Sequence, residues 1–267
     1  MEKKYRITVL MAIYNCAPTL KEAIDSLYAQ TYNNFKLVLC DDASTDNTYE
    51  IAKQYAEKHD NIVLIQNEKN MKLAYSLNRC LEYADTEYVA RMDGDDISLP
   101  TRFEKQIKFL DNHPEYAVVS CPMIYFDETG DWGFGKSVEK PTIEIFKKGV
   151  PHPHAPSMTR TAVMKDVDGY TVDKRLVRGQ DYYLWYKIYK AGYQGYNLQE
   201  HLYKMRDDRN AMARRTFRNR YNAFLIKNEV LKDLGIQNSL FYSLPSLLKG
   251  FIPTPLMKLL RKKRMKK

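Results

Sequence analysis

The stretch "YVARMDGDDISLP", residues 88–100, places three aspartates directly after a short apolar run and ahead of a proline. The apolar and β-branched residues predict a strand that ends near Asp93. Asp95 and Asp96 follow within three residues, and like charges this close repel one another unless a cation offsets them. The stretch therefore suggests a cation site at the end of a strand.

Similar apolar runs precede this strand, and helical patterns separate them. The strands that we predict are 6–13, 36–42, 62–67 and 87–93. The helices that we predict between them are 19–30, 47–59 and 70–84. Strands that alternate with helices in this way indicate an α/β fold with a mostly parallel central sheet flanked by helices.

The rest of the chain is less regular. The elements that we predict there are a helix at 101–113, a strand at 116–126, an irregular region at 127–157, a helix at 180–192 that ends at Gly192, and a longer helix at 211–234 that stops before Gly235. Residues 246–267 are interrupted by prolines and end in a basic run.

Both acidic clusters of the first half, "DDASTDNT" (41–48) and "DGDD" (93–96), follow predicted strands. In parallel sheets, ligands bind beyond the carboxyl ends of the strands. Each cluster also has a simpler explanation, because Asp46 or the aspartates before Pro100 can cap a helix. An EF-hand is excluded, since neither cluster has a glycine at the sixth loop position.

The first glycine of the chain is Gly94. Phosphate-binding loops of the Walker and dinucleotide types need glycines so that backbone amides can approach the anion. Residues 1–93 therefore contain neither loop. If this sheet binds a nucleotide diphosphate, a divalent cation held by carboxylates is the expected counter-charge, and Mg²⁺ or Mn²⁺ prefers such oxygen ligands.

Four segments in order resemble the motifs of glycosyltransferase family 2, of the bacterial polysaccharide type. They are "TVLMAIYN" (8–15), "DDASTDNT" (41–48), "YVARMDGDD" (88–96) and "GQDYYLWYKI" (179–188). The similarity covers residues 5–210 and implies a GT-A fold, a nucleotide-sugar donor and inversion at the sugar. It also implies a nucleotide-sugar-binding half at 1–100, an acceptor-binding half at 101–210, and a helical extension at 211–267.

The resemblance also implies roles for individual residues. The expected nucleotide-sugar-binding residues are Ala12 and Tyr14 at the nucleobase, Asp42 on the base itself, Asn70, Arg79, and Asp93 on the ribose. Asp95 is expected to bind the Mn²⁺ or Mg²⁺ ion that bridges the diphosphate. Asp181 matches the catalytic base.

Several positions depart from the family pattern. Lys72 stands where a glycine is usual, and Leu77 stands where many relatives have an arginine, which leaves Lys72 or Arg79 as the phosphate contact. The acceptor-region motifs are altered to "HAPSM" (154–158) and "KMRDD" (204–208). From these we take His154 and Arg206 as candidate acceptor or phosphate residues.

The chemistry of sugar transfer fits these residues. A metal ion on Asp95 stabilises the departing diphosphate, so no general acid is needed. One carboxylate, Asp181, accepts the proton of the attacking hydroxyl.

Other features have simpler interpretations. Tyr182, Tyr183, Trp185 and Tyr186 could stack on a sugar, but core packing of an amphipathic helix is favoured for most of them. His152 and His154 suggest a metal pair, but a proline-rich loop is favoured. The four cysteines lack the spacing of a metal site and are interpreted as reduced, buried thiols of a cytosolic protein.

The net charge of +9 is concentrated at the C-terminus, because residues 249–267 contain eight basic residues and no acidic one. We find no signal peptide and no apolar run of about 18 residues that could span a membrane. The basic tail suits an anionic lipid surface, and nucleic-acid binding is the rival that the acidic motifs disfavour. A tail that is simply solvated is the third interpretation. The resemblance to family 2 favours the membrane, because it implies lipid-linked saccharide acceptors at the cytoplasmic face, and on that basis we expect a cytoplasmic protein, peripheral at the inner face of the cell membrane, that binds no nucleic acid.

The sequence thus predicts a metal-dependent, inverting hexosyltransferase. We expect a UDP-hexose or UDP-N-acetylhexosamine donor, with a dTDP-sugar as the alternative, and a saccharide acceptor that is lipid-linked, in cell-surface polysaccharide synthesis. The competing hypothesis is a non-catalytic nucleotide- or saccharide-binding member of the same fold.

Overall fold

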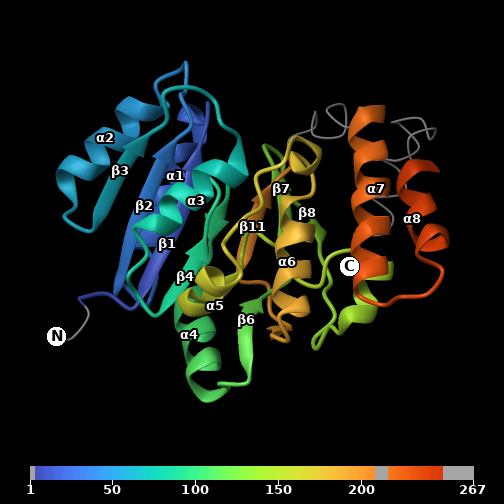
Figure 1. Cartoon of the computed structure of the whole chain (residues 1–267). Helices are drawn as coiled ribbons and strands as arrows, with labels where there is room; N and C mark the ends of the chain where they lie inside the picture. The colour runs from blue at the N-terminus through green and yellow to red at the C-terminus, as the bar shows by residue number, and fades with distance from the viewer. Residues whose placement is uncertain (1–3, 208–215, 249–267) are drawn as a thin grey trace.

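The computed structural model describes residues 4–207 and 216–248. It contains two β-sheets (Figure 1). The larger sheet has seven strands in the order β10-β6-β9-β4-β1-β2-β3. Its strands are β1 (Ile7–Ile13), β2 (Phe35–Asp41), β3 (Ile62–Gln66), β4 (Tyr88–Arg91), β6 (Tyr116–Ser120), β9 (Met158–Arg160) and β10 (Gln194–Asn197). Strands β4, β1, β2 and β3 are mutually parallel, and β9 runs antiparallel to both β4 and β6.

The smaller sheet has four strands in the order β5-β11-β7-β8. They are β5 (Ile97–Ser98), β7 (Ile124–Asp127), β8 (Gly130–Phe134) and β11 (Tyr203–Arg206). The chain passes from the larger sheet into the smaller one through the acidic turn that joins β4 to β5.

Helices cover both faces of the larger sheet (Figure 1). They are α1 (Ala17–Tyr28), α2 (Thr48–Lys58), α3 (Leu73–Glu82), α4 (Arg102–Asn112), α5 (Thr161–Asp166), α6 (Gln180–Lys190), α7 (Phe217–Asp233) and α8 (Ser239–Leu248), with 3-10 turns η1 (Ile143–Lys147) and η2 (Lys174–Leu176). None of the helices in the described residues combines the length and the apolarity needed to cross a membrane.

The alternation of side chains along β1 explains the two cores. Val9 and Met11 point to one face and pack in a buried cluster with α1 and α4, whereas Leu10 points to the other face and packs with α3, α5, α6 and α7. Because both faces of a parallel strand are buried, nearly every β1 residue is apolar. The predicted fold class is confirmed.

The predicted strand at 116–126 was wrong as a single element. The chain forms β6, breaks at residues 121–123 around Pro122, and continues as β7 in the other sheet. Proline has no N–H to donate to a sheet, which suits this break. The region predicted as irregular contains β8 and η1, and α8 lies within the predicted helical extension at 211–267, although its own bounds were not predicted.

The helix predicted at 211–234 corresponds to α7, although residues 211–215 lie outside the described residues. It ends before Gly235, which has φ +71°, as predicted. Gly192 follows the last turn of α6 with φ +88°. These two glycines adopt the left-handed conformation that closes a helix.

Lys72 has φ +74° and ψ 164°, a conformation that is nearly restricted to glycine. Its backbone N–H donates to Asp42 Oδ2 at 2.9 Å, and the N–H of Met71 donates to Asp42 Oδ1 at 2.8 Å. The buried Asp42 carboxylate therefore holds the start of α3 in this strained form. A glycine at this position would adopt the same backbone without strain.

We expect Lys72→Gly to be more stable than Lys72→Ala by about 1 kcal/mol, because strain of this kind costs about 1–3 kcal/mol and glycine returns part of it as backbone entropy. Both variants lose the lysine side chain, so their comparison isolates the Cβ atom. Urea unfolding followed by circular dichroism measures the difference, and equal stabilities would show that the strain is absent.

Candidate active site

The carboxyl ends of three adjacent parallel strands gather the predicted nucleotide residues at one edge of the larger sheet. β1 ends beside half-buried Ala12 and exposed Tyr14, β2 ends at buried Asp42, and β4 leads into Asp93. The N–H of Asp42 donates to the Ile13 carbonyl at 2.9 Å, which ties the ends of β1 and β2 together. The structure thus brings these four residues to one edge, as the strand pattern predicted. We refer to the edge of the larger sheet that carries Asp42 and Asp93 as the donor edge.

The Asp42 carboxylate is largely occupied by its own chain. Besides the two backbone N–H groups at Met71 and Lys72, it accepts a hydrogen bond from Asn67 Nδ2 at 2.7 Å. An ionised carboxylate has about four acceptor positions, so capacity for one further donor remains. This capacity suits contact with a single N–H of a nucleobase.

Asn70 and Arg79 have different positions. The Asn70 Oδ1 atom is buried and has no hydrogen-bond partner among the described residues, so an acceptor is left over beside the donor edge. Arg79 donates to the Gln66 carbonyl at 2.9 Å and to Asn67 Oδ1 at 3.0 Å. Arg79 therefore holds the segment that surrounds Asp42, while Leu77 is buried in the core.

The "DDASTDNT" segment also links the loops at this edge. Asp46 accepts hydrogen bonds from the N–H of Ala17, at the start of α1, and from the N–H of Thr48. Asn15 Oδ1 accepts from the N–H of Thr45 at 2.8 Å. Asp46 thus joins the starts of two helices, although Asn47 and not Asp46 is the N-cap residue of α2.

A buried arginine at the end of β4 holds the "DGDD" turn in place. Arg91, at the end of β4, is 6% exposed, and its guanidinium donates to both oxygens of Asp93 at 2.7 and 2.5 Å. The N–H of Asp93 donates to the Tyr203 hydroxyl at 3.2 Å. Sequence reasoning missed Arg91, although a charged residue inside a buried strand was a usable signal.

The three aspartates form a group that fits a divalent cation. One oxygen from each of Asp93, Asp95 and Asp96 lies within 4.8 Å of the others. Burial of its carboxyl group, and then the Asp93 carboxylate, raise the pKa of Asp95 to about 6, although the residue as a whole is exposed. Burial, followed by the carboxylates of Asp93 and Asp95, raises the pKa of Asp96 well above its usual value.

Asp96 Oδ2 is buried without a hydrogen-bond partner among the described residues, whereas Asp96 Oδ1 accepts from the N–H of Arg206 at 2.8 Å. Crowded carboxylates with an unsatisfied oxygen are destabilising on their own, and a hard cation with oxygen ligands relieves both effects. The residues present therefore fit Mn²⁺ or Mg²⁺.

Arg206 lies on the outer side of this turn. Its Nε donates to the Asp95 carbonyl at 2.9 Å, and its guanidinium also binds Glu22 and stacks over the Phe126 ring. The predicted acceptor or phosphate residue is thus brought to the site, where these contacts hold the turn in place.

Asp181 lies in the first turn of α6. Burial raises the pKa of Asp181 above its usual value, while the N–H of Tyr182 and the positive charge of Arg91 act in the opposite direction. Burial also raises the pKa of Tyr170, on which the charges of Arg91, Asp93 and Asp181 act as well. The charge of Arg91 therefore acts on both Asp181 and Tyr170, and a raised pKa suits a general base.

The two histidines have protein partners. His152 is buried between Asn197 Oδ1 at 2.9 Å and the Tyr189 hydroxyl at 3.0 Å, and His154 Nε2 lies 2.8 Å from the Tyr170 hydroxyl. In the described part of the chain, neither belongs to a group of three potential metal ligands. The loop interpretation of "PHPHAP" is supported, and His154 reaches the site through Tyr170.

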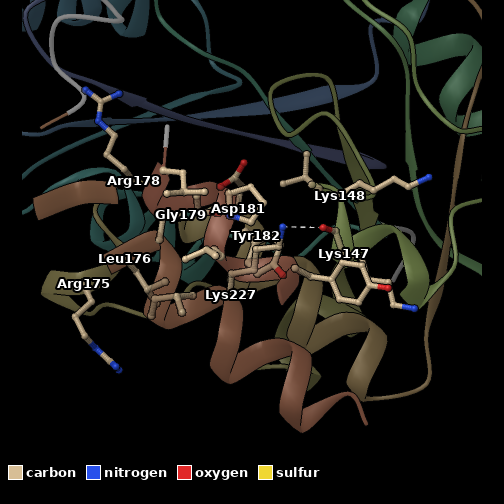
Figure 2. Close-up of a pocket in the computed structure, with 18 of the residues that line it drawn as sticks. Lys147, Lys148, Arg175, Leu176, Arg178, Gly179, Asp181, Tyr182 and Lys227 are labelled. Carbon is tan, nitrogen blue, oxygen red and sulfur yellow. Dashed lines mark hydrogen bonds between the residues drawn. The ribbon is translucent and has the colours of Figure 1, made fainter. Parts of the chain in front are cut away.

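Of the aromatic residues of α6, Trp185 and Tyr186 are buried in the core, as favoured from the sequence. Tyr182 instead lines a cavity together with Asp181 (Figure 2). The residues of this cavity come from segments far apart in the sequence, so no sequence pattern pointed to it.

The comparisons with known proteins agree with this geometry. The family model described as Glycosyl transferase family 2 matches residues 8–234. The chain therefore belongs to glycosyltransferase family 2, and it is a glycosyltransferase of the GT-A fold.

Among similar sequences is EpsE of Bacillus subtilis, named as a glycosyltransferase, with 42% identity over 97% of this chain and 94% of EpsE. The amylovoran biosynthesis glycosyltransferase AmsE of Erwinia amylovora is 30% identical over 96% of this chain and 98% of AmsE. The Escherichia coli protein WfaP is 27% identical over 86% of this chain and 87% of its own length. It is named as a UDP-Glc:α-D-GlcNAc-diphosphoundecaprenol β-1,3-glucosyltransferase.

Solved structures show the same fold. TarS of Staphylococcus aureus (residues 1–349), in complex with UDP-GlcNAc, has a TM-score of 0.70 and 21% identity. The match covers 92% of this chain and 71% of that one. The mannosyltransferase PcManGT of Pyrobaculum calidifontis, in complex with GDP-Man and Mn²⁺, has a TM-score of 0.65 and 20% identity. The match covers 98% of this chain and 80% of that one.

Gly94 allows the acidic turn to approach the β1–α1 loop. A Cβ atom at this position would lie 2.7 Å from Cys16 Sγ and 3.2 Å from Ile13 Cγ2. We expect Gly94→Ala to lower the free energy of unfolding by about 1–3 kcal/mol, the usual cost of overpacking. The double variant Gly94→Ala/Cys16→Ala is expected to recover most of this loss, because the closest atom is removed.

A double-mutant cycle in urea, with Cys16→Ala alone as the control, measures this coupling. If the two changes are simply additive, the close approach at Cys16 does not limit the packing of the turn.

Proposed function

We propose that the protein is a metal-dependent, inverting hexosyltransferase that uses a UDP-hexose or UDP-N-acetylhexosamine and acts in cell-surface polysaccharide synthesis. The observation that carries the proposal is the group of Asp93, Asp95 and Asp96 at the carboxyl edge of the sheet, with the charge of Arg91 acting on both Asp93 and Asp181. The names of WfaP and of the TarS complex support a UDP-linked donor. The PcManGT complex, with GDP-Man and Mn²⁺, supports the metal.

On the donor side, Asp95 and Asp96 would hold the cation, and Arg91 positions Asp93, which would contact the ribose. When bound, the cation supplies positive charge against the departing diphosphate, so the chain needs no acidic group there. Asp42 contacts the base through its remaining acceptor position. Because Arg79 is engaged with Gln66 and Asn67, the exposed Lys72 is the better candidate for the phosphate contact.

On the acceptor side, Asp181 accepts the proton of the attacking hydroxyl. The hydroxyl oxygen forms the new bond to the anomeric carbon as the bond to the nucleoside diphosphate breaks, which inverts the configuration. The raised pKa makes Asp181 a stronger base than an exposed aspartate. His154 forms a hydrogen bond with the Tyr170 hydroxyl and holds the Tyr170 side chain in place. The charges of Arg91, Asp93 and Asp181 all act on this tyrosine.

The proposed acceptor is a saccharide linked to a lipid, as the name of WfaP states for that protein. The biosynthesis of amylovoran in the name of AmsE supports a polysaccharide pathway. We further propose that the enzyme works at the inner face of the cell membrane, with the basic residues of 249–267 at the lipid surface. That tail lies outside the described residues.

Thermal unfolding tests the donor and the metal. We expect UDP with Mn²⁺, at about one hundred times the dissociation constant, to stabilise the protein by about 2.7 kcal/mol, and UDP with a chelator to stabilise it much less. Asp95→Asn is expected to lose the metal-dependent part, whereas Asp60→Asn, an exposed aspartate outside the acidic turn, keeps it. A larger shift with dTDP would redirect the donor to dTDP-sugars, and equal shifts with and without Mn²⁺ would contradict the metal's role.

Asp181→Asn tests the base. Removing a general base typically lowers a rate by about 10²- to 10⁴-fold, and we expect transfer to fall by this amount. Binding of UDP and Mn²⁺ should remain as in the unmodified protein. Transfer measured with labelled UDP-glucose in membranes that contain acceptor distinguishes the outcomes, and an unchanged rate would remove Asp181 from the mechanism.

A further inference from the structure

Asp181 lines a cavity of about 660 Å³, a volume typical of small-molecule sites. The cavity lies between the end of η1, the loop at 175–179, the start of α6, and the helices α7 and α8 (Figure 2). It is separate from the donor edge, because none of Asp42, Asp93 or Asp95 lines it.

The lining of the cavity has two chemical parts. The apolar part comes mainly from α7 and α8, with residues that include Ala223, Ile226, Phe241, Leu244 and Leu248. The charged part comprises five basic residues, Lys147, Lys148, Arg175, Arg178 and Lys227. Among the described residues that line the cavity, Asp181 is the only acidic one. This combination fits an amphipathic anion.

The basic residues differ in whether their charge is available. Arg175 is bound to Asp173 at 2.8 Å, Lys147 is bound to Glu144, and Lys227 donates to the Lys147 carbonyl at 2.8 Å. The side chains of Lys148 and Arg178, in contrast, have no hydrogen-bond or ion-pair partner among the described residues. Figure 2 shows them on the two sides of the Asp181 carboxylate with their charged ends directed outward, so both side chains must rotate to reach one ligand. A phosphate group is the ligand that suits two free cations of this kind.

The apolar wall continues onto the surface along α8. This helix buries polar side chains and exposes apolar ones, the opposite of an ordinary surface helix. Ser239 and Ser243 are buried, and their hydroxyls donate to Asn228 Oδ1 and to the Ser239 carbonyl. The large apolar side chains point outward instead. The exposed ones are Leu240 (58%), Phe241 (73%), Leu244 (43%) and Leu248 (52%). Three of these also line the cavity, so one apolar surface runs from beside Asp181 to the outside of the molecule.

We propose that this cavity is the binding site for the lipid phosphate of the acceptor, an inference that rests on the proposed function. Lys148 and Arg178 bind the phosphate or diphosphate, and the first part of the lipid chain lies along α8. The saccharide joined to that phosphate then extends to Asp181. The lipid, and not a second copy of the chain, is the occupant because the lining combines an apolar wall with two free cations, and the sequence that follows α8 contains eight basic residues.

Binding of farnesyl diphosphate, a short lipid diphosphate, tests the site without any transfer reaction. Titration calorimetry on the full chain is expected to show binding at least tenfold tighter than that of inorganic pyrophosphate, because pyrophosphate gains nothing from the apolar wall. The double variant Lys148→Gln/Arg178→Gln should weaken binding of farnesyl diphosphate at least tenfold. Leu244→Gln, at an exposed position that folding does not require, should weaken farnesyl diphosphate but not pyrophosphate.

Lys232→Gln is the matched control, since Lys232 is an exposed cation of α7 outside the cavity. Its affinity for farnesyl diphosphate should equal that of the unmodified protein. If the double variant and the control bind equally well, the proposal is overturned. It is also overturned if farnesyl diphosphate binds no better than pyrophosphate.

Two further measurements separate this proposal from the proposed function and from non-specific binding to membrane lipid. Stabilisation by UDP with Mn²⁺ should be the same in every variant, so its absence from the unmodified protein would count against the proposed function and not against the cavity. Vesicles of phosphatidylglycerol should bind the double variant and the unmodified protein alike. If the double variant binds neither phosphatidylglycerol vesicles nor farnesyl diphosphate, the cavity binds bulk membrane lipid and the acceptor proposal fails.

Discussion

The bidentate ion pair between Arg91 and Asp93 is the contact on which the donor edge depends. Arg91 is buried at the end of β4, and a buried guanidinium without a carboxylate partner would be strongly destabilising. The pair therefore fixes the direction of Asp93 and, with it, the course of the turn. Asp95 and Asp96 are left close to Asp93 with raised pKa values, so the turn is prepared for a positive charge.

This turn is also the joint between the two sheets. It leaves β4 of the larger sheet, enters β5 of the smaller one, and is held there by the backbone of Arg206 in β11. Gly94 lets it pass close to Cys16 in the β1–α1 loop. Because the turn is anchored from three sides, the carboxylates keep their relative positions without a ligand, which lowers the cost of ordering them when a cation binds.

The acceptor side is built from later parts of the chain. The first turn of α6 places Asp181 in the lining of a cavity that α7 and α8 also line, and the charge of Arg91 acts on its carboxylate. The buried serines and exposed leucines of α8 make sense if this helix faces an apolar medium and not water. In the mechanism that we propose, donor and acceptor reach Asp181 from surfaces of opposite character, one acidic and one basic and apolar.

Local pattern was enough to predict the four parallel strands, the helices between them and the position of both acidic clusters. Apolar periodicity and the alternation of strand and helix are properties of short segments, and a parallel sheet brings its carboxyl ends to one edge. The approximate positions of Asp42, Asp93 and Asp95 followed from this rule alone. The role of Asp181 came from family resemblance, because nothing in its neighbourhood distinguishes a base from a residue at the start of a helix.

Contacts between distant segments decided the rest. The break at Pro122 sends one apolar run into two sheets, the positive φ of Lys72 is set by Asp42 thirty residues earlier, and Arg79 is held by Gln66 and Asn67. The cavity combines residues 147–150, 175–182 and 223–248. A sequence pattern records what each segment prefers by itself, whereas these features depend on which segments the fold packs together, and only the tertiary structure contains that information.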